Sequence, residues 1–546
     1  MPGVRVIGFG GENRALHPTL LPETSATVSL NHRPLRGDLR PWRSPTTVAT
    51  VTVGSKSIYR MGRDVPSDTN YWLAWSTPTN VVRGFNQSDT NERTYFTGSG
   101  TPKWTDTAKA LGAGAQPVAT RELGLPAPVA APTLSASGGV STTNVTRAYV
   151  YTYVNDVNHE SAPSPAALIT CKQDATVSLT ALSAAPSGSY GINRIRVYRS
   201  ESGSTTSDYF FVREVAVATS TTDPNLTIGE PLETSDWVPA PGIPQGGLYN
   251  VTEPTLTCLT GMWNEMMAGI SGRGVRFCEP GAPYAWPLKY EIAPADYSPV
   301  ALGVFGQTLV VLTNGNPTLV GGTSPDSLDE QPLDFLQACV SAQSVVSMGH
   351  GVAWASPDGL AYVGAGGARL LTAACMTRED WQALNPSSII GAMWEGRYYG
   401  FYQPTAGNYR AFMLDLADPN GLYFMDFGAD AVYVDDLQDV MYVLQGTNVR
   451  KWDAGAALTV TWRSKEFRLG KPMTSMAVGQ VLGDSYPVAF KLFADGTQRF
   501  SGTVSSAQPF FLPAGYYAER VQMEVSTSGS LQSIAVAHSV DELKGV

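Results

Sequence analysis

ALGVFGQTLVVLTNGNPTLVGG, residues 301–322, is the stretch that decides the fold of this chain. It contains three short apolar runs, which are separated by two turns that are rich in glycine and asparagine. Each run is too short for a typical helix, and glycine, asparagine and proline favour reversal of the chain. The stretch therefore predicts three consecutive antiparallel strands.

The same unit of three strands and two turns recurs along residues 255–455. The middle strand of each unit is expected in one of five apolar runs, namely MMAGIS from Met266, TLVVLT from Thr308, GVAWAS from Gly351, RYYGFY from Arg397 and VMYVLQ from Val440. These runs begin roughly 43 residues apart, a period that is typical of the four-stranded blades of a β-propeller. An all-β sandwich whose hairpins share this spacing by coincidence is the alternative.

Two further β-rich segments precede this repeat. Residues 46–105 show the same alternation of strands and turns, and we expect them to complete the propeller as a further blade. Between the linkers LPAPVAAP (125–132) and WVPAPGIPQGG (237–247), short strands have period-two patterning, with Tyr149, Tyr151 and Tyr153 on one face. This insertion is predicted to be an immunoglobulin/fibronectin-III-like sandwich.

The predicted fold class is thus mainly β, a β-propeller with an inserted immunoglobulin/fibronectin-III-like sandwich and a C-terminal β module. The predicted domains are an N-terminal platform region that contributes a blade, the sandwich, the propeller blades and the C-terminal module, at residues 1–125, 126–244, 245–457 and 458–546. Short helices are expected at TREDWQAL, which is capped by Thr377, and at TDTAKALG.

Composition excludes several classes of protein. Hydrophobic residues make up 43% of the 546 residues, so the chain can bury a core and is not disordered. The 37 Lys and Arg residues against 47 Asp and Glu residues give a net charge of −10, without a basic cluster. This argues against a protein that grips nucleic acid by its phosphates. The N-terminus lacks the apolar stretch of a secretory signal, and no membrane segment is predicted.

The motifs that could carry catalysis or ligand binding are incomplete. VRVIGFGGENR (4–14) begins like a dinucleotide-binding fingerprint but has Asn13 where the third glycine belongs. The five histidines are far apart, and the acidic residues between 415 and 439 are expected in turns. We therefore predict that the chain is not an enzyme and has no catalytic residues, no metal site and no cofactor. The cysteines form no C-x-x-C pair and are expected to be reduced, mostly buried thiols: Cys171, Cys258, Cys278, Cys339 and Cys375.

A series of segments, in order along the chain, carries a family resemblance. They are LLPETSATVSLN (20–31), NHRPLRGDLRPWRSP (31–45), DTNERTYFTGSGTPKWT (89–105), YVYTYVNDVNHESAPSP (149–165), INRIRVYRSESGSTTSDYFFV (192–212) and SKEFRLGKPM (464–473). Together they resemble the tail nozzle proteins, also called tail tubular protein B, of short-tailed bacteriophages. The resemblance covers most of the chain, and it is weak between residues 255 and 455.

The resemblance implies a structural subunit of the virion, made in the cytoplasm of the host bacterium. It implies a homohexamer that forms the lower tube of the tail, below a head-to-tail adaptor ring, and that bears tail fibre or spike proteins. Double-stranded DNA is expected to leave through the channel without specific binding. A net charge of −10 fits a channel that lets DNA pass.

Four residues are candidates for contacts with a neighbouring subunit or with the adaptor. Arg36, Arg40, Trp42 and Arg43 lie in the segment that most resembles the family, and arginine and tryptophan are favoured at interfaces. An ordered loop that packs on its own subunit is the alternative. A second function class is a propeller glycan-binding protein or glycosidase that acts on a cell surface, which predicts a carboxylate-lined central pocket.

Overall fold

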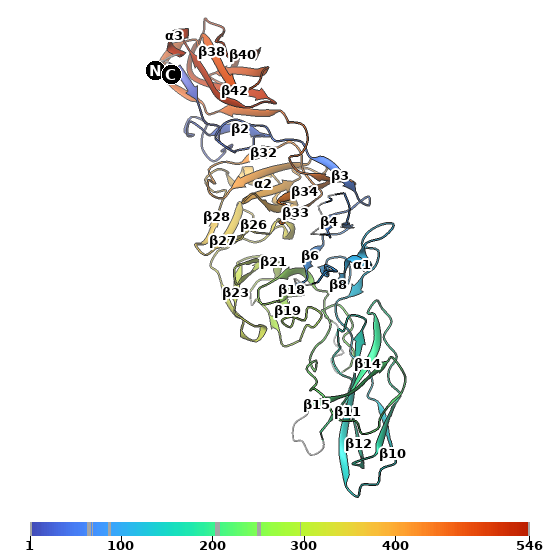
Figure 1. The fold of residues 1–546 in the computed structure, drawn as a ribbon. Helices are drawn as coiled ribbons and strands as arrows, with labels where there is room; N and C mark the ends of the chain where they lie inside the picture. The colour runs from blue at the N-terminus through green and yellow to red at the C-terminus, as the bar shows by residue number, and fades with distance from the viewer. Residues whose placement is uncertain are drawn as a thin grey trace. The chain divides into compact units, whose positions relative to one another are not determined.

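The computed structural model describes residues 3–62, 67, 69–85, 89–201, 208–247, 253–294 and 296–543, without the side chains of residues 470–474. This part of the chain is mainly β (Figure 1), which confirms the predicted fold class at that level. The chain divides into two compact units. Unit 1 comprises residues 1–72, 314–316 and 335–546, and unit 2 comprises residues 73–313 and 317–334.

The helices in the described residues are short. They are α1 (Thr107–Ala110), α2 (Arg378–Ala383) and α3 (Val540–Leu543), and 3₁₀ turns span Pro325–Ser327, Ala342–Ser344 and Pro386–Ser388. The predicted start of α2 is confirmed, because the Thr377 side chain accepts a hydrogen bond from the backbone N–H of Asp380 at 3.1 Å. No helix in the described ranges is long and apolar enough to cross a membrane.

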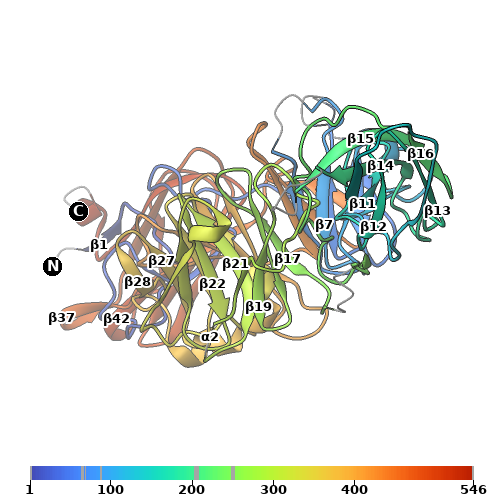
Figure 2. The ribbon, with the colours of Figure 1, turned by 90° about the horizontal axis from the view of Figure 1, so that it is seen from below.

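Unit 2 contains three four-stranded antiparallel sheets in which each strand pairs with the next one along the chain. Their strands are β6 (Asn80–Arg83), β7 (Thr94–Thr97), β8 (Lys103–Thr105) and β9 (Arg121–Glu122); β17 (Thr257–Gly261), β18 (Met267–Ser271), β19 (Gly274–Phe277) and β20 (Glu291–Ile292); and β21 (Pro299–Phe305), β22 (Thr308–Thr313), β23 (Thr318–Gly321) and β24 (Asp329–Pro332). Figure 2 shows β21 and β22 side by side. The second and third sheets share one core, which includes Phe277, Leu309 and Val311.

Unit 1 contains three further sets of four neighbouring strands, one of which, β29–β32, is the end of a ten-stranded sheet. Their strands are β25 (Val346–Ser347), β26 (Gly351–Ala355), β27 (Leu360–Gly364) and β28 (Gly367–Leu370); β29 (Ile390–Trp394), β30 (Arg397–Tyr402), β31 (Arg410–Asp415) and β32 (Tyr423–Met425); and β33 (Ala431–Asp435), β34 (Val440–Gln445) and β35 (Asn448–Lys451) with β3 (Thr46–Thr50). Tyr398 and Phe412 pack against Ala353 and Tyr362, so the first two of these sheets share a core.

The five apolar runs of the repeat are confirmed as strands β18, β22, β26, β30 and β34, each of them second in its sheet. Every residue of β18 and β26 is buried. Each of these strands has a hydrogen-bonded neighbour on both sides, and both of its faces are covered by packed side chains. Such strands have near-continuous apolar sequences instead of alternating ones.

The turn between β29 and β30 shows how the residues between two apolar runs of the repeat reverse the chain. Its two residues, Glu395 and Gly396, have φ angles of 50° and 72°. Both angles lie in the left-handed region, as a two-residue type I′ hairpin turn requires. Glycine adopts this conformation without strain because it has no Cβ atom.

The strands of residues 46–105 belong to more than one sheet, so this segment does not form a single blade as predicted. β3 pairs with β35 in unit 1, whereas β6, β7 and β8 belong to a sheet of unit 2 that ends with β9. Between them in the sequence lie β4 (Ser57–Arg60) and β5 (Trp72–Trp75). The physical reason is that β33–β35 form only three strands, which leaves the edge of β35 to be covered, and β3 covers it.

The insertion consists of two sheets in the order β10-β13-β16 and β12-β11-β14-β15. Tyr149, Tyr151 and Tyr153 are buried, and they share one core with Val177 and Leu179 of the other sheet. Their predicted position on one face is therefore confirmed. The strands are β10 (Thr133–Ser137), β11 (Asn144–Asn155), β12 (Ala167–Lys172), β13 (Thr176–Thr180), β14 (Ile192–Ser200), β15 (Tyr209–Ala216) and β16 (Thr221–Asp223).

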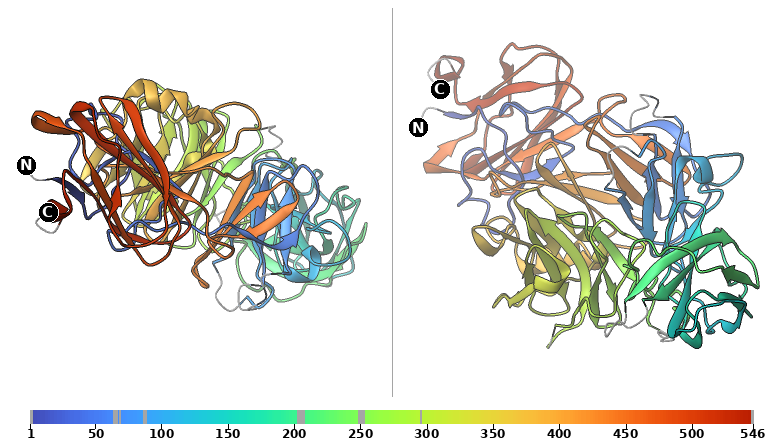
Figure 3. Two further views of the ribbon diagram at one scale, coloured as in Figure 1. Left: turned by 90° about the horizontal axis from the view of Figure 1, so that it is seen from above. Right: turned by 60° about the horizontal axis from the view of Figure 1, so that its bottom comes forward.

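The C-terminal β-rich segment also takes up strands from the beginning of the chain. β1 (Gly3–Val6) pairs with β43 (Leu531–Ala537), and β2 (Ala26–Leu30) lies between β32 and β36 (Val460–Ser464). The first strand of the chain (blue) accordingly lies beside its last strand (red; Figures 1 and 3). The remaining strands are β37 (Phe467–Thr474), β38 (Val478–Gly483), β39 (Val488–Ala494), β40 (Thr497–Val504), β41 (Phe510–Phe511) and β42 (Tyr517–Thr527).

All five cysteines are free thiols. Cys171, Cys278, Cys339 and Cys375 are buried, which confirms that most of them lie in the interior, and Cys258 is half-buried. Burial raises the pKa of the Cys278 thiol to about 12. A thiol with so high a pKa is not ionised near neutral pH and is a poor nucleophile.

Candidate functional site

The family-like segment 31–45 is an ordered loop that folds back onto unit 1. Asn31 has a φ angle of 56°, and its side chain donates to the carbonyl of Thr459 at 3.1 Å and accepts from the N–H of Asp426 at 3.2 Å. Asparagine tolerates this left-handed conformation better than most residues. The loop is thereby anchored to two segments that lie about 400 residues further along the chain.

Trp42 belongs to the core of unit 1 and not to its surface. The side chain is 0% exposed and packs edge-on against Tyr399 and Trp452, with ring centroids 6.2 and 5.8 Å away. Its backbone N–H donates to the carbonyl of Asn31 at 2.9 Å. For Trp42, the alternative of packing within its own subunit is therefore the arrangement that the structure shows.

The other three candidate residues are placed differently. Arg36 and Arg43 are exposed, and the backbone N–H of Arg43 donates to Asp453 at 2.9 Å. Arg40 is half-buried and forms an ion pair with Asp38 at 2.5 Å. The structure does not bring the four side chains into one cluster, and Arg36 and Arg43 are the two that present their side chains on the surface.

Arg33, which the sequence did not single out, makes the contacts that hold this loop to the sheets. Its guanidinium forms ion pairs with Asp453 at 2.5 Å and with Glu395 at 3.1 Å, and it lies 5.0 Å from the centroid of the Trp42 ring. No local motif distinguishes Arg33 from its neighbours. Its role arises from residues that the fold brings in from elsewhere.

His32 in the same loop makes stability depend on pH. The side chain is fully buried, and burial lowers the pKa of the ring to about 4, against the opposing effects of the Asp38 carbonyl and carboxylate. Between pH 6.5 and about 4 the unfolded chain therefore binds a proton that the folded chain does not. Stability from this group is complete above pH 6.5 and is lost as the pH falls.

We expect the wild-type chain to lose up to about 1.4 kcal/mol of stability per pH unit in this range from His32 alone. The measurement is the urea midpoint at pH 7, 6, 5 and 4.5 for wild type and His32→Gln. The difference between the urea midpoints of the two chains should shrink as the pH falls, because the variant has no histidine at this position whose protonation favours the unfolded chain. Parallel pH profiles would contradict the assignment.

Unit 1 exposes apolar side chains in its N-terminal segment and on its C-terminal strands, and unit 2 exposes others, such as Val140 (91%) and Leu168 (73%). Ile7 is 73% exposed, Leu20 71%, Phe511 83% and Tyr517 75%, and Leu35 is also exposed. All of them belong to unit 1.

The dinucleotide-like and acidic motifs have structural roles. A Cβ atom at Gly10 would lie 2.8 Å from the carbonyl oxygen of Thr24, so glycine is needed there for a close backbone approach. Asp415 and Asp435 form ion pairs with Arg397 and Arg60. In the described ranges, no group of three or more His, Cys, Asp or Glu side chains could hold a metal ion.

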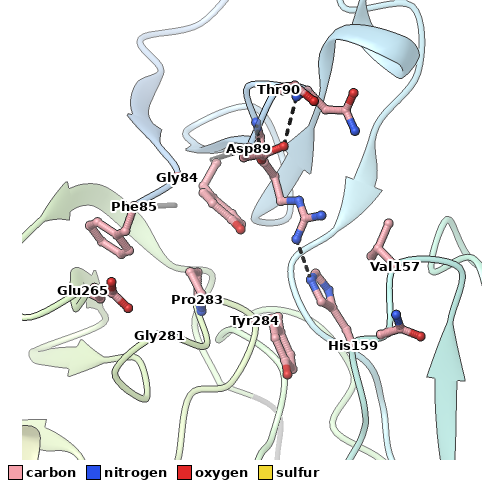
Figure 4. A pocket seen from close by; sticks show the side chains of 14 residues that line it. Gly84, Phe85, Asp89, Thr90, Val157, His159, Glu265, Gly281, Pro283 and Tyr284 are labelled. Atoms are coloured by element: carbon pink, nitrogen blue, oxygen red, sulfur yellow. Dashed lines mark hydrogen bonds between the residues drawn. The ribbon is translucent and has the colours of Figure 1, made fainter. Parts of the chain in front are cut away.

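Unit 2 contains a cleft of about 930 Å³ (Figure 4), which no sequence motif predicted. It is formed by residues 84–85, residues between 89 and 95, the turn that follows β11, the β17–β18 turn and the loop that follows β19. Figure 4 shows Glu265 and His159 on opposite sides of it. The lining includes Phe85, Asp89, Asn91, Arg93, Asn158, His159, Glu265 and Tyr284.

The centre of polar contacts in this cleft is Arg93. Its Nη1 donates to Nε2 of His159 at 3.2 Å, and its guanidinium lies 5.2 Å from the centroid of the Trp104 ring. The His159 ring stacks on Tyr284 at 3.9 Å, with 11° between the ring planes. Burial and the positive charges of Arg93 and Lys109 lower the pKa of His159 to about 3, so the ring is neutral at physiological pH.

Asp89 shapes the loop that carries Arg93. Its two carboxylate oxygens accept hydrogen bonds from the backbone N–H groups of Asn91 and Arg93, both at 3.0 Å. An aspartate that closes a turn in this way fixes the backbone from which the Arg93 side chain projects.

No protein-family model matches the chain, and no curated protein does. Among solved structures, an exo-β-1,3-galactanase from Phanerochaete chrysosporium is 12% identical over 74% of this chain and 100% of its own, with a TM-score of 0.24. PorZ, a surface component of the type-IX secretion system of Porphyromonas gingivalis, is 10% identical over 81% of this chain and 62% of its own, with a TM-score of 0.27. Trypanosoma rangeli sialidase is 8% identical over 99% and 97%, with a TM-score of 0.17. Similarity at this level assigns this chain neither a family nor an activity.

Proposed function

We propose that this chain is a structural subunit of the tail nozzle of a short-tailed bacteriophage. In this proposal six copies form a tube through which genomic DNA is ejected into the host. An adaptor ring binds above the tube, and fibre or spike proteins attach to it. The proposal gives the chain a role in the virion and assigns it no enzymatic activity.

The observation that carries the proposal is the pairing of the two ends of the chain. Residues 20–45 and residues from 464 onward bear family-like motifs at opposite ends of the sequence, and β2 pairs with β36 in one sheet. Leu39 and Leu531 exchange two backbone hydrogen bonds of 3.0 Å. The family-like motifs from the two ends of the sequence thus lie together in one folded unit. This supports a fold in common with the family better than isolated motifs would, because segments that contact each other must fit together.

The surface of unit 1 supports self-association. Phe511 and Tyr517 are more than two-thirds exposed, and so are Ile7 and Leu20. Transfer of such side chains into a subunit contact is favourable, because it removes apolar area from water. The exposed arginines Arg36 and Arg43 lie in the same family-like loop as Leu35.

We also propose a finer fold, in which the six sets of four neighbouring strands are the blades of a propeller and the insertion is an immunoglobulin/fibronectin-III-like sandwich. Within unit 2, β6 contacts β17 and β17 contacts β21; within unit 1, β25 contacts β29 and β29 contacts β33. Contacts between first strands of successive sheets are expected of blades around a common axis. The pairing of β3 with β35 would complete the last blade with an N-terminal strand.

The test is to image the purified full-length chain by negative-stain electron microscopy, alone and mixed with the adaptor encoded by the same genome. Six-fold rings with an open pore are expected. The variant Arg36→Glu/Arg43→Glu should reduce the fraction of chains in rings about tenfold, because charge reversal at an interface opposes association. The control Arg273→Glu/Arg378→Glu, at two exposed arginines elsewhere, should assemble like wild type.

Thermal melting of both variants separates assembly from folding, since exposed substitutions should leave the melting temperature nearly unchanged. A compact single chain in both samples, above all one that hydrolyses oligosaccharides, would contradict the nozzle proposal. That result would favour the second function class, a glycan-binding protein or glycosidase.

A further inference from the structure

Arg93 is a fixed cation whose charge is not neutralised by the protein. Among the described residues its guanidinium forms no ion pair; Nη1 donates to the neutral His159 ring, and Nε has no hydrogen-bond partner. It also contacts the Tyr95 side chain and the face of Trp104, which is 0% exposed, and neither of these groups carries a negative charge at neutral pH. A half-buried arginine is ordinarily paired with a carboxylate, because a desolvated charge without a counter-charge is unfavourable.

His159 holds the guanidinium in place without reducing its charge. Arginine has only donors, so Nε2 of His159 must accept, and the hydrogen of the neutral ring is then on Nδ1. His159 is 4% exposed, and Nδ1 has no partner. A glutamate at this position could accept the same hydrogen bond and would cancel the charge. The observed pair instead leaves a preorganised positive charge at the cleft, which is what binding of an anion requires.

The rest of the cleft is suited to a ligand with many hydroxyl groups. The carboxylates of Asp89 and Glu265 can accept hydrogen bonds from hydroxyl groups, Asp89 in addition to the two backbone N–H groups that it already accepts. Asn91 and Asn158 supply amides that both donate and accept. Phe85 and Tyr284 are half-buried aromatic side chains that can pack against the C–H face of a sugar ring. Burial, followed by nearby Glu160, raises the pKa of Tyr284 to about 12, so its hydroxyl stays a donor.

From this geometry we propose that the cleft of unit 2 binds an acidic saccharide, with the carboxylate of a hexuronate residue on the guanidinium of Arg93. Arg93 is the binding residue, and His159 is a positioning residue that acts through it. The 930 Å³ cleft can hold more than one sugar residue. This inference does not depend on the proposed nozzle function, because it concerns a site within a single chain.

Isothermal titration calorimetry on the full-length chain tests it, with trigalacturonate as the probe and the neutral trigalactose as its match. Trigalacturonate should bind at least tenfold more tightly than the neutral sugar, and its affinity should fall with added salt, since the contact is electrostatic. Equal affinity for the two trisaccharides would overturn the inference. So would equal binding of a glutamate-rich hexapeptide, because the cleft would then recognise a carboxylate and not a sugar.

Variants separate the charge from the fold. Arg93→Gln should weaken trigalacturonate binding at least tenfold, and Arg273→Gln, at an exposed arginine outside the cleft, should change it less than twofold. His159→Gln keeps a neutral acceptor for Arg93 and should retain binding within threefold, whereas His159→Glu should lose it tenfold by neutralising Arg93. Unchanged binding in Arg93→Gln, or equal effects of His159→Gln and His159→Glu in chains with wild-type melting temperatures, would overturn the assignment. These outcomes are independent of ring formation, which is measured separately.

Discussion

Replacement of Arg60 by methionine is expected to lower the free energy of unfolding by about 3–5 kcal/mol. Nη1 of Arg60 is 2.7 Å from Oδ2 of Asp435, and the two side chains are 0% and 3% exposed. The substitution leaves the Asp435 carboxylate in the interior without its counter-charge. It still accepts backbone hydrogen bonds from Leu437 and Gln438 at 3.2 and 3.1 Å, which do not replace a full positive charge.

The measurement is urea unfolding followed by circular dichroism, with unit 1 expected to unfold at a lower midpoint. The double variant Arg60→Met/Asp435→Asn should recover most of the loss, because asparagine keeps the turn contacts and removes the buried charge. Arg378→Met breaks an exposed pair with Asp358, whose side chains are 66% and 38% exposed, and should cost less than about 1 kcal/mol. Equal losses for Arg60→Met and Arg378→Met would show that burial does not set the effect.

Trp42→Ala is expected to destabilise the chain by about 3–5 kcal/mol even in the absence of any partner. The side chain fills a core that it shares with Tyr399, Trp452 and Met413, and alanine would leave a cavity in the place of the indole. A residue whose role is only to contact another subunit would instead alter assembly and leave the stability of the single chain unchanged. The prediction therefore separates a core role from an interface role for this residue.

Differential scanning calorimetry of the dilute chain measures this loss. The neighbouring substitution Arg43→Ala is the matched control, since the Arg43 side chain is exposed. Trp42→Phe should retain part of the stability, because it keeps an aromatic ring in the same site. An unchanged melting temperature of Trp42→Ala would contradict the core role of Trp42.

The strands of the repeat could be predicted because their signal is local. In β22, six consecutive residues are apolar or threonine, and turns on either side contain Gly306 and Asn314. The same holds for Tyr149, Tyr151 and Tyr153, whose period-two spacing alone places them on one face of a strand. The position of a strand, and the side of the sheet that each of its residues faces, depend on fewer than about ten consecutive residues. Side-chain periodicity covers this range.

The candidate site could be predicted only in part. The sequence places arginine and tryptophan together in residues 31–45, but their residue types do not show that Arg43 is exposed and Trp42 is buried. Arg93 and His159 are 66 residues apart and belong to no motif. Their contact depends on how the loops of unit 2 pack, and no pattern within a short stretch of the sequence indicates it.

By itself, the sequence determined that this protein is mainly β, that its strands recur in five similarly spaced units and that α2 begins at Thr377. Apolar periodicity, turn residues and helix caps are short-range effects, so they can be recognised in a linear chain. The tertiary structure alone decided that β1 and β2 join the C-terminal strands, that β3 covers β35, and that Arg93 is held by a neutral ring. Such pairings join segments up to hundreds of residues apart, because edge strands and buried charges are satisfied by whichever partners the folded chain brings to them.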